Sequence, residues 1–151
     1  EAHYNRGIVN ANSGNLRTAI DDFDRALELK PDFADAMHNR GLTWGNLGQE
    51  WRAIADFEAA TTQDPSLTEA HVAKGAVLIN LSQFPQALES LDRAILLDPN
   101  RPGAFALRAV AHAIVADDES ADSDIARAVE LGFSATALQS DVDRVREARG
   151  N

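Results

Sequence analysis

The sequence repeats itself every 34 residues, and this period constrains the fold more than any other feature. Small residues keep the step through four units in four series: Gly7, Gly41, Gly75, Ala109; Ala2, Ala36, Ala70, Ala104; Ala19, Ala53, Ala87, Ala121; Ala26, Ala60, Ala94, Ala128. Large apolar residues and prolines keep the same step: Phe23, Phe57, Leu91, Ile125; Pro31, Pro65, Pro99. Self-similarity at a fixed period of this length predicts an array of stacked structural units.

Each unit is expected to form two helices joined by a tight turn. In the first unit, apolar residues recur every three or four positions from Leu16 to Leu27, which predicts one apolar stripe along a helix. The segment before it, residues 2–12, contains no proline, and Ser13-Gly14-Asn15 between the two segments is a turn cluster. Pro31 ends the pair, because proline cannot continue a helix. The sequence therefore predicts antiparallel helix hairpins stacked in a row.

The spaced pattern Gly7, Ala19, Phe23, Ala26 and Pro31, repeated in the second and third units, resembles the tetratricopeptide repeat. The resemblance covers residues 1 to about 133. It implies an all-α fold, a right-handed α-solenoid of four hairpins, which forms a single domain over residues 1–151. The expected repeats span about 1–33, 34–67, 68–101 and 102–133.

Two units depart from the pattern of this family. The fourth unit has Ala109 in place of glycine, Asp122 where Ile20 and Ile54 stand in the earlier units, and Gly132-Phe133 in place of the Asp-Pro ending. In the second unit Glu50 replaces the apolar Leu16, and Trp51 beside it is expected to compensate. Because the small residues of the fourth unit keep their places, it is still expected to be a hairpin.

A capping helix is expected at about residues 135–148, after the last repeat. Leu138, Val142 and Val145 make a narrow apolar stripe on it, and the remaining positions are mostly charged. One apolar side and one wetted side suit the end of a solenoid. No comparable segment precedes Glu1, so the first hairpin is expected to present an open end, covered by missing sequence or by another molecule.

Composition excludes several classes of protein. The net charge of −10 has the wrong sign for a generic nucleic-acid binder or a lipid-surface module. The chain has no cysteine, and its longest apolar stretch, residues 103–116, is too short to span a membrane. It begins at Glu1 without an initiator Met or an apolar leader, so we expect a fragment or a processed form. A cytoplasmic location is expected, and an extracytoplasmic one stays open if a leader was removed.

The resemblance places partner binding on the first helix of each hairpin, which lines a concave groove in this family. The positions that it implies for this groove are Tyr4, Ile8, Ala11, His38, Leu42, Gly45, Val72, Ala76, Ile79, Ala106, Val110 and Ala113. These positions become apolar toward the C-terminus. Two interpretations stay open for the apolar half: it binds an apolar peptide or amphipathic helix, or it packs on the capping helix or a neighbouring chain.

Repeated polar residues suggest further contacts. Asn5 and Asn39 share one repeat position and are expected to contact a ligand, because an amide both donates to and accepts from a peptide backbone. Glu1, Asp35 and Glu69 also share a position. They would steer a basic segment of a partner, although favourable placement in the first turn of a helix explains them better.

Heat-shock chaperone tails are not expected to bind. Family members that bind these tails hold the terminal carboxylate with a Lys-Asn-Asn-Lys-Arg set, and the matching places in this chain are Tyr4, Ile8, Asn39, Glu69 and Ala73. Only Asn39 matches, and Glu69 would repel a carboxylate. In the next frame along the chain none of the five places matches.

No catalytic motif stands out, and neither a cofactor nor a metal is expected. The four histidines include no i, i+4 pair, and the acidic run Asp117-Asp118-Glu119 lacks the glycine and the closing glutamate of a calcium-binding EF-hand loop. This run is interpreted as the solvated start of a helix. We therefore expect a non-catalytic protein-interaction module that binds a partner peptide or helix in its groove. The alternatives are a docking or regulatory arm of a larger enzyme and a self-assembling scaffold, which would form homo-oligomers through the uncapped first repeat.

Overall fold

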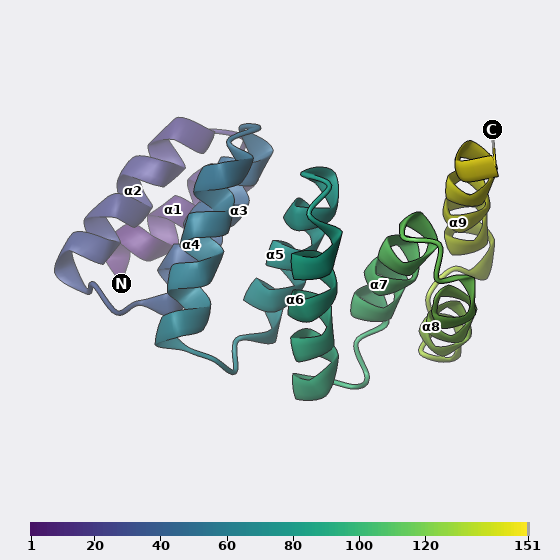
Figure 1. Ribbon diagram of the computed structural model, residues 1–151. Helices are drawn as coiled ribbons and strands as arrows, with labels where there is room; N and C mark the ends of the chain where they lie inside the picture. Colours follow the sequence, from purple (N-terminus) through teal and green to yellow (C-terminus); the bar gives the residue numbers. More distant parts are fainter. Residues whose placement is uncertain (151) are drawn as a thin grey trace. The chain divides into compact units, whose positions relative to one another are not determined.

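The computed structural model describes residues 1–150, which form nine α-helices and no strand (Figure 1). Their bounds are α1 Ala2–Asn12, α2 Leu16–Leu29, α3 Ala34–Asn46, α4 Glu50–Gln63, α5 Thr68–Asn80, α6 Phe84–Leu97, α7 Pro102–Ile114, α8 Asp118–Glu130 and α9 Ala135–Gly150. The fold is an all-α helical repeat, and two helices fall within each 34-residue unit. None of the helices described between residues 1 and 150 is long and apolar enough to cross a membrane.

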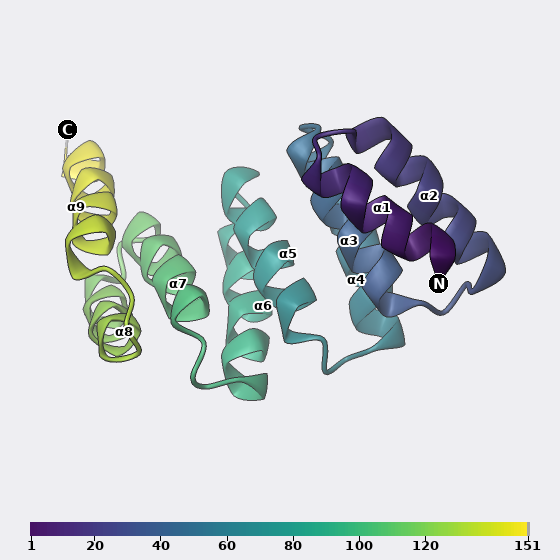
Figure 2. The same ribbon diagram turned by 180° about the vertical axis from the view of Figure 1, so that it is seen from behind.

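The contacts divide the chain into two compact units, residues 1–77 and residues 78 onward. The first unit contains α1 to α4 and most of α5. Its first helices, α1 and α3, lie on one side and its second helices, α2 and α4, lie on the other (Figures 1 and 2). Each hairpin packs on itself, and α2 packs against α3.

Glycines let a phenylalanine fill the space between the two helices of each of the first two hairpins. Phe23 and Phe57 are 0 % and 1 % exposed. A Cβ placed on Gly7 would lie 2.7 Å from the Phe23 ring, and a Cβ on Gly41 would lie 2.7 Å from the Phe57 ring. Real Cβ atoms do not approach a ring so closely, so the repeated glycine is needed where the aromatic ring meets the first helix.

The turn inside each hairpin contains one residue in the left-handed conformation. Gly14 and Gly48 have φ of +80° and +71°. Ser82 and Ala116, one and two repeats further on, hold φ of 58° and 67° without the freedom of glycine. The turn geometry is therefore kept through four repeats, although glycine supplies it only in the first two.

Trp51 does not compensate for Glu50, contrary to the expectation from the sequence. Its side chain lies in the first turn of α4 and is 61 % exposed. The buried positions of α4 are instead Ala53, Ile54, Asp56, Phe57 and Ala60, which keep the repeat pattern without it. The second repeat therefore has a polar residue, Glu50, at the position where the first repeat has the apolar Leu16.

The second unit has its own core, closed by α9. Phe105, Ala109, Ile125 and other buried residues of α7 and α8 form a cluster that Leu138 and Val142 of α9 join. Leu138 is 2 % exposed and Val142 is 0 % exposed, and Val145 packs against the same cluster. The predicted apolar stripe of the last helix is therefore buried, and α9 contacts both α7 and α8.

A ladder of ion pairs follows the 34-residue period and links neighbouring hairpins. Arg40 of α3 donates to Asp56 of its own hairpin through Nε and Nη2 at 2.8 and 2.6 Å, and to Asp24 of the preceding hairpin through Nη1 at 2.5 Å. Arg108 repeats this arrangement with Asp124 and Asp92 at 2.6 to 2.8 Å. Bonds to the two carboxylates raise the pKa of both guanidinium groups, against the opposing effect of burial. Each arginine thus stays charged and joins two hairpins.

The first and third repeats vary this ladder. Arg6 bonds to Asp22 of its own hairpin at 2.6 Å. In the third repeat Lys74 pairs with Glu58 of the preceding hairpin at 2.9 Å, and Ser90 stands where the other repeats have the buried aspartate. The buried carboxylate and the arginine are therefore replaced together.

The free energy of unfolding is expected to fall as the pH drops through about 4. The hydrogen bond from Arg6 lowers the pKa of Asp22, bonds from Arg149 and Arg146 lower the pKa of Asp118, and bonds from Ser120 lower the pKa of Asp117. A carboxyl group with a lower pKa in the folded state takes up protons more readily when unfolded. Its stabilising contribution is therefore complete above the unfolded pKa and is lost as the pH falls through the folded value.

Urea denaturation followed by circular dichroism at pH 7, 5 and 3 measures this effect. We expect the midpoint to change little between pH 7 and 5 and to fall between pH 5 and 3. The Asp118→Asn variant should start lower at pH 7 and lose less on acidification. A midpoint that is the same at pH 7 and pH 3 would contradict the assignment.

Candidate functional site

The predicted partner-binding residues of the first unit lie on α1 and α3, which are neighbours (Figure 2). Tyr4 and Ile8 of α1, and His38 and Leu42 of α3, are each four residues apart, so each pair lies on one face of its helix. The Tyr4 ring packs 4.6 Å from the ring of Phe33. Nδ2 of Asn39 donates to the Tyr4 hydroxyl at 3.2 Å, which joins the two helices at this face.

Asn39 has less free hydrogen-bonding capacity than its sequence position suggested. Its Nδ2 also donates to the main-chain oxygen of Asp35 at 2.8 Å, so both amide hydrogens are used inside the protein. Only its Oδ1 is left to accept from a ligand. Asn5, at the same repeat position, is exposed on α1.

The Tyr4 hydroxyl adds a donor to this face. Burial and the nearby charge of Asp35 raise the pKa of Tyr4. The bond from Asn39 lowers it and offsets them only in part. The phenol therefore keeps its proton, and since its oxygen accepts from Asn39, the O–H is left to donate. A main-chain or side-chain oxygen of a ligand is a suitable acceptor.

Apolar surface lies beside these polar groups. Leu42 is 41 % exposed, and Ile8 and Ala11 are half-buried. His38 is half-buried, with its ring 5.7 Å from that of Phe57. In the part of α5 that belongs to the first unit, Val72 and Ala76 are half-buried. This face therefore combines an exposed leucine with a hydroxyl donor and an amide acceptor.

The predicted residues of α7 need correction. Ala106 is 5 % exposed and Ala113 is 0 % exposed, and both belong to the core cluster that contains Leu138 and Val142 of α9. Val110 packs against the same cluster. Of the two interpretations of the apolar half, packing within the core that α9 closes holds for Ala106 and Ala113, so these two side chains are not open to a partner, whereas Val110 is half-buried. Ile79 is half-buried and belongs to the second unit.

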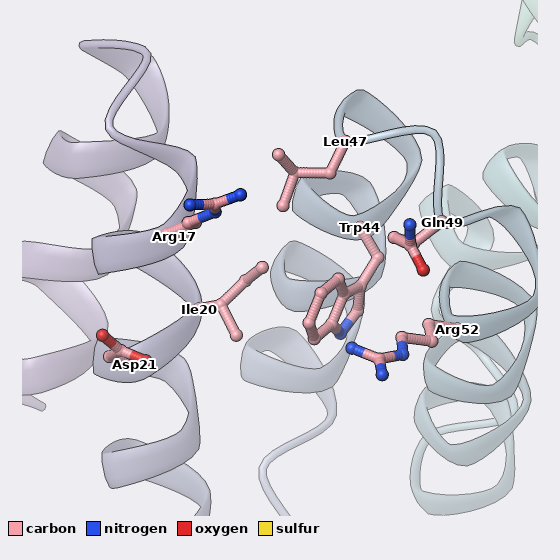
Figure 3. Close-up of a pocket in the computed structure, with 7 residues that line it drawn as sticks. All are labelled: Arg17, Ile20, Asp21, Trp44, Leu47, Gln49 and Arg52. Carbon is pink, nitrogen blue, oxygen red and sulfur yellow. The ribbon is translucent and has the colours of Figure 1, made fainter.

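A second candidate site is a cleft of about 520 Å³ between α2 and the α3–α4 hairpin. Figure 3 shows Ile20 facing Trp44 across it, with Arg17 and Arg52 at opposite ends. The Arg52 guanidinium lies 4.6 Å from the centre of the Trp44 ring, a cation–π contact. Residues that line the cleft are Arg17, Ile20, Asp21, Trp44, Leu47, Gln49 and Arg52.

The sequence did not single out this cleft. Trp44 stands at a repeat position that holds Asn10, Leu78 and His112 in the other units, so the period gives no signal there. Trp44 follows His38 by six residues, which is about 240° around the helix, so the cleft and the predicted face lie on different sides of α3. The cleft has apolar walls and two guanidinium groups, which suit a ligand that carries an apolar side chain next to a carboxylate.

The acidic run stands at the start of α8, as predicted, but Asp118 is not simply solvated, because it accepts from Arg146 at 2.9 Å and from Arg149 at 2.6 Å. Asp117 is the N-cap of α8, and its carboxylate accepts from the main-chain nitrogen of Ser120 at 3.2 Å. Nδ1 of His112 lies 3.3 Å from the same carboxylate. Over residues 1–150, no three histidine or acidic side chains are grouped so that they could hold a metal ion.

Comparisons with known proteins agree with the helical-repeat fold. Residues 1–33, the whole first hairpin, match the family model of the tetratricopeptide repeat. The first hairpin is therefore identified as a tetratricopeptide repeat. No curated protein sequence matches it.

Solved structures support the same repeat fold over nearly the whole chain. A crystal structure of the protein MamA superimposes with a TM-score of 0.86 at 18 % identity, over 99 % of this chain and 81 % of that one. A thermophilic tetratricopeptide-repeat protein of Thermus thermophilus gives 0.78 at 18 %, over 99 % and 82 %. The first tetratricopeptide-repeat domain of Spaghetti (RPAP3), bound to an HSP90 peptide, gives 0.75 at 22 %, over 76 % and 91 %.

Proposed function

We propose that this tetratricopeptide-repeat protein is a non-catalytic interaction module, and that the α1–α3 face binds a peptide or helix of a partner protein. The observation that carries the proposal is the exposed Leu42 beside the Tyr4–Asn39 pair. An apolar side chain of a ligand packs on Leu42, and the Tyr4 O–H and the Asn39 Oδ1 bond to polar groups of its backbone.

The charges near this face favour a ligand with a basic residue. Asp35 lies in the first turn of α3 and is close enough to raise the pKa of Tyr4. The whole chain has a net charge of −10, which attracts a basic segment during encounter. The structure of Spaghetti shows an HSP90 peptide on a similar fold. This chain lacks the cationic set that binds chaperone tails in the family, so we still predict that an acidic chaperone tail does not bind.

The Leu42→Arg variant is expected to weaken the binding of a ligand peptide at least about tenfold, because it removes the apolar contact and buries a charge. A peptide is first selected from a random displayed library on the full chain, without selection against any variant. Its affinity for the wild type and for each variant is then measured by calorimetry.

Leu96→Arg is the matched control. Leu96 is 72 % exposed on α6, so the substitution adds the same charge without disturbing a buried contact. Circular dichroism checks that both variants are folded. Equal affinity for the wild type and the folded Leu42→Arg variant would show that the α1–α3 face is not the binding site.

A further inference from the structure

The cleft between α2 and the α3–α4 hairpin, which we call the Trp44 cleft, contains two guanidinium groups that pair with no acid. Arg17 of α2 and Arg52 of α4 line it, and within residues 1–150 neither of them forms an ion pair. Arg52 lies over the Trp44 ring instead, a contact that leaves its N–H groups able to donate. Arginines elsewhere, such as Arg25 and Arg40, do pair with acids. The cleft is therefore a basic place in a chain whose net charge is −10.

The rest of the lining is mostly apolar. Ile20 and Trp44 face each other between the two arginines (Figure 3). A flat ring suits the space beside an indole, because aromatic side chains pack favourably against one another. Asp21 is the single acid among the lining residues and is not paired with Arg17, one turn before it. Two cations thus face one carboxylate, and the cleft keeps an excess of positive charge.

The repeat fold does not need these two arginines. The positions that match them in the later repeats hold no cation, and the residues there are Trp51, Pro85 and Glu119 for Arg17, and Gln86 and Ser120 for Arg52. The later repeats form their helices all the same. Two cations that the fold does not use, and that no acid of the described chain neutralises, favour an anionic ligand from outside.

A smaller cavity continues the Trp44 cleft along α2. It has a volume of about 280 Å³ and is lined by the start of α2 and by the α3–α4 turn. Arg17 and Leu47 line both this cavity and the larger one of about 520 Å³. Two adjoining hollows suit a stretch of peptide chain better than a single small group.

The cleft also sets the spacing of residues in such a peptide. Successive side chains of an extended chain point to opposite sides, so residues two positions apart share a side. An aromatic residue between Ile20 and Trp44 therefore directs acids two positions before and after it toward the ends of the cleft, where the arginines lie. No aromatic residue among residues 1–151 stands between acids at this spacing, so a second copy of this region does not supply the ligand.

We infer that the Trp44 cleft binds an extended acidic segment of a partner protein, with an aromatic side chain between Ile20 and Trp44 and acidic side chains on Arg17 and Arg52. The cleft is separate from the α1–α3 face, because Trp44 follows Leu42 by two residues, about 200° around α3. Its ligand is acidic, whereas the charges near the α1–α3 face favour a basic one. Each of the two proposals can therefore fail without the other.

The fluorescence of Trp44 reports directly on this site. The full chain with Trp51→Phe is used, because Trp44 is then the only tryptophan of the sequence. Trp51 is 61 % exposed, so its substitution disturbs no buried contact. The probe is the peptide GESFSEG, acetylated and amidated so that only its side chains are charged. Two control peptides are GKSFSKG, with both acids replaced by lysine, and GSEFESG, which has the same composition but places the acids on the opposite side from the ring.

Two protein variants in the same Trp51→Phe background complete the test. Arg17→Glu reverses one charge of the cleft. Arg93→Glu is its matched control, because Arg93 is exposed on α6 and forms no ion pair within residues 1–150. Circular dichroism checks that both variants are folded.

We expect the probe to cause a saturable change in Trp44 emission. Its affinity should fall at least about tenfold with Arg17→Glu and stay unchanged with Arg93→Glu, and both control peptides should bind at least about tenfold more weakly. The HSP90 peptide SRMEEVD should not bind, because the apolar side chain between its acids is a valine, which buries less surface than a ring.

The inference would be overturned by the absence of a saturable change up to about 1 mM probe, which corresponds to binding weaker than about 4 kcal/mol. Affinity that Arg17→Glu leaves unaltered would also overturn it. The same holds if either control peptide, or the HSP90 peptide, binds as tightly as the probe.

Discussion

The Phe57→Ala substitution is expected to lower the free energy of unfolding by about 3–5 kcal/mol, the typical cost of removing a buried aromatic ring. Phe57 is 1 % exposed and fills the space that Gly41 leaves open between α3 and α4. Alanine would leave a cavity where two helices of one hairpin meet, and neither backbone can close it without moving the whole helix. Urea denaturation at pH 7, followed by circular dichroism, measures the loss.

Trp51→Ala is the control for this prediction. It removes an even larger aromatic side chain from the same helix, but one that is 61 % exposed, so the change should stay within about 0.5 kcal/mol. Equal losses for Phe57→Ala and Trp51→Ala would mean that the repeated glycine and phenylalanine do not hold the hairpin together.

The Arg40→Ala substitution is expected to cost about 3–5 kcal/mol, because it leaves the buried carboxylate of Asp56 without its partner. Asp56 is 6 % exposed, and Arg40 bonds to it through two nitrogens and to Asp24 through the third. The loss combines an unpaired buried charge with a broken link between two hairpins. The same denaturation experiment measures it.

The third repeat of this chain suggests a double variant to compare with Arg40→Ala. In the third repeat Lys74 and Ser90 stand where Arg40 and Asp56 stand in the second. Arg40→Lys combined with Asp56→Ser copies this pair, removes the buried charge and keeps a cation for Asp24. The double variant should therefore be clearly more stable than Arg40→Ala. If it is equally unstable, the cost does not come from the uncompensated carboxylate.

The hairpins were predictable from the sequence because the period reports local requirements. Two units have a glycine opposite a phenylalanine, alanines stand where helices touch, and a proline follows three of the four pairs. Each of these residues acts within one unit or between adjacent ones. The stripe of Leu138 and Val142 was predictable for the same reason, since one helix carries the whole signal. The turns at Ser82 and Ala116 keep the left-handed conformation, although the sequence has no glycine there to predict it.

The composition of the binding face was harder to predict, because spacing shows which side of a helix a residue occupies but not what covers that side. Ala106 lies on the expected face of α7, yet α9 packs there. Asn39 lies on the expected face of α3, yet its amide is used by Tyr4 and Asp35. The Trp44 cleft depends on one residue outside the repeat pattern. The ion-pair ladder follows the series Arg6, Arg40, Lys74 and Arg108, which keeps the 34-residue period but was not predicted from the sequence.

Hydrogen–deuterium exchange of the full chain, with and without the selected ligand peptide, tests most directly whether the first helices of the hairpins bind the partner. The account predicts slower exchange of α1 and α3 amides around Tyr4, Ile8, Asn39 and Leu42, with α2, α4 and α9 unchanged. Protection confined to α2 and the turn around Leu47, which border the Trp44 cleft, would contradict it.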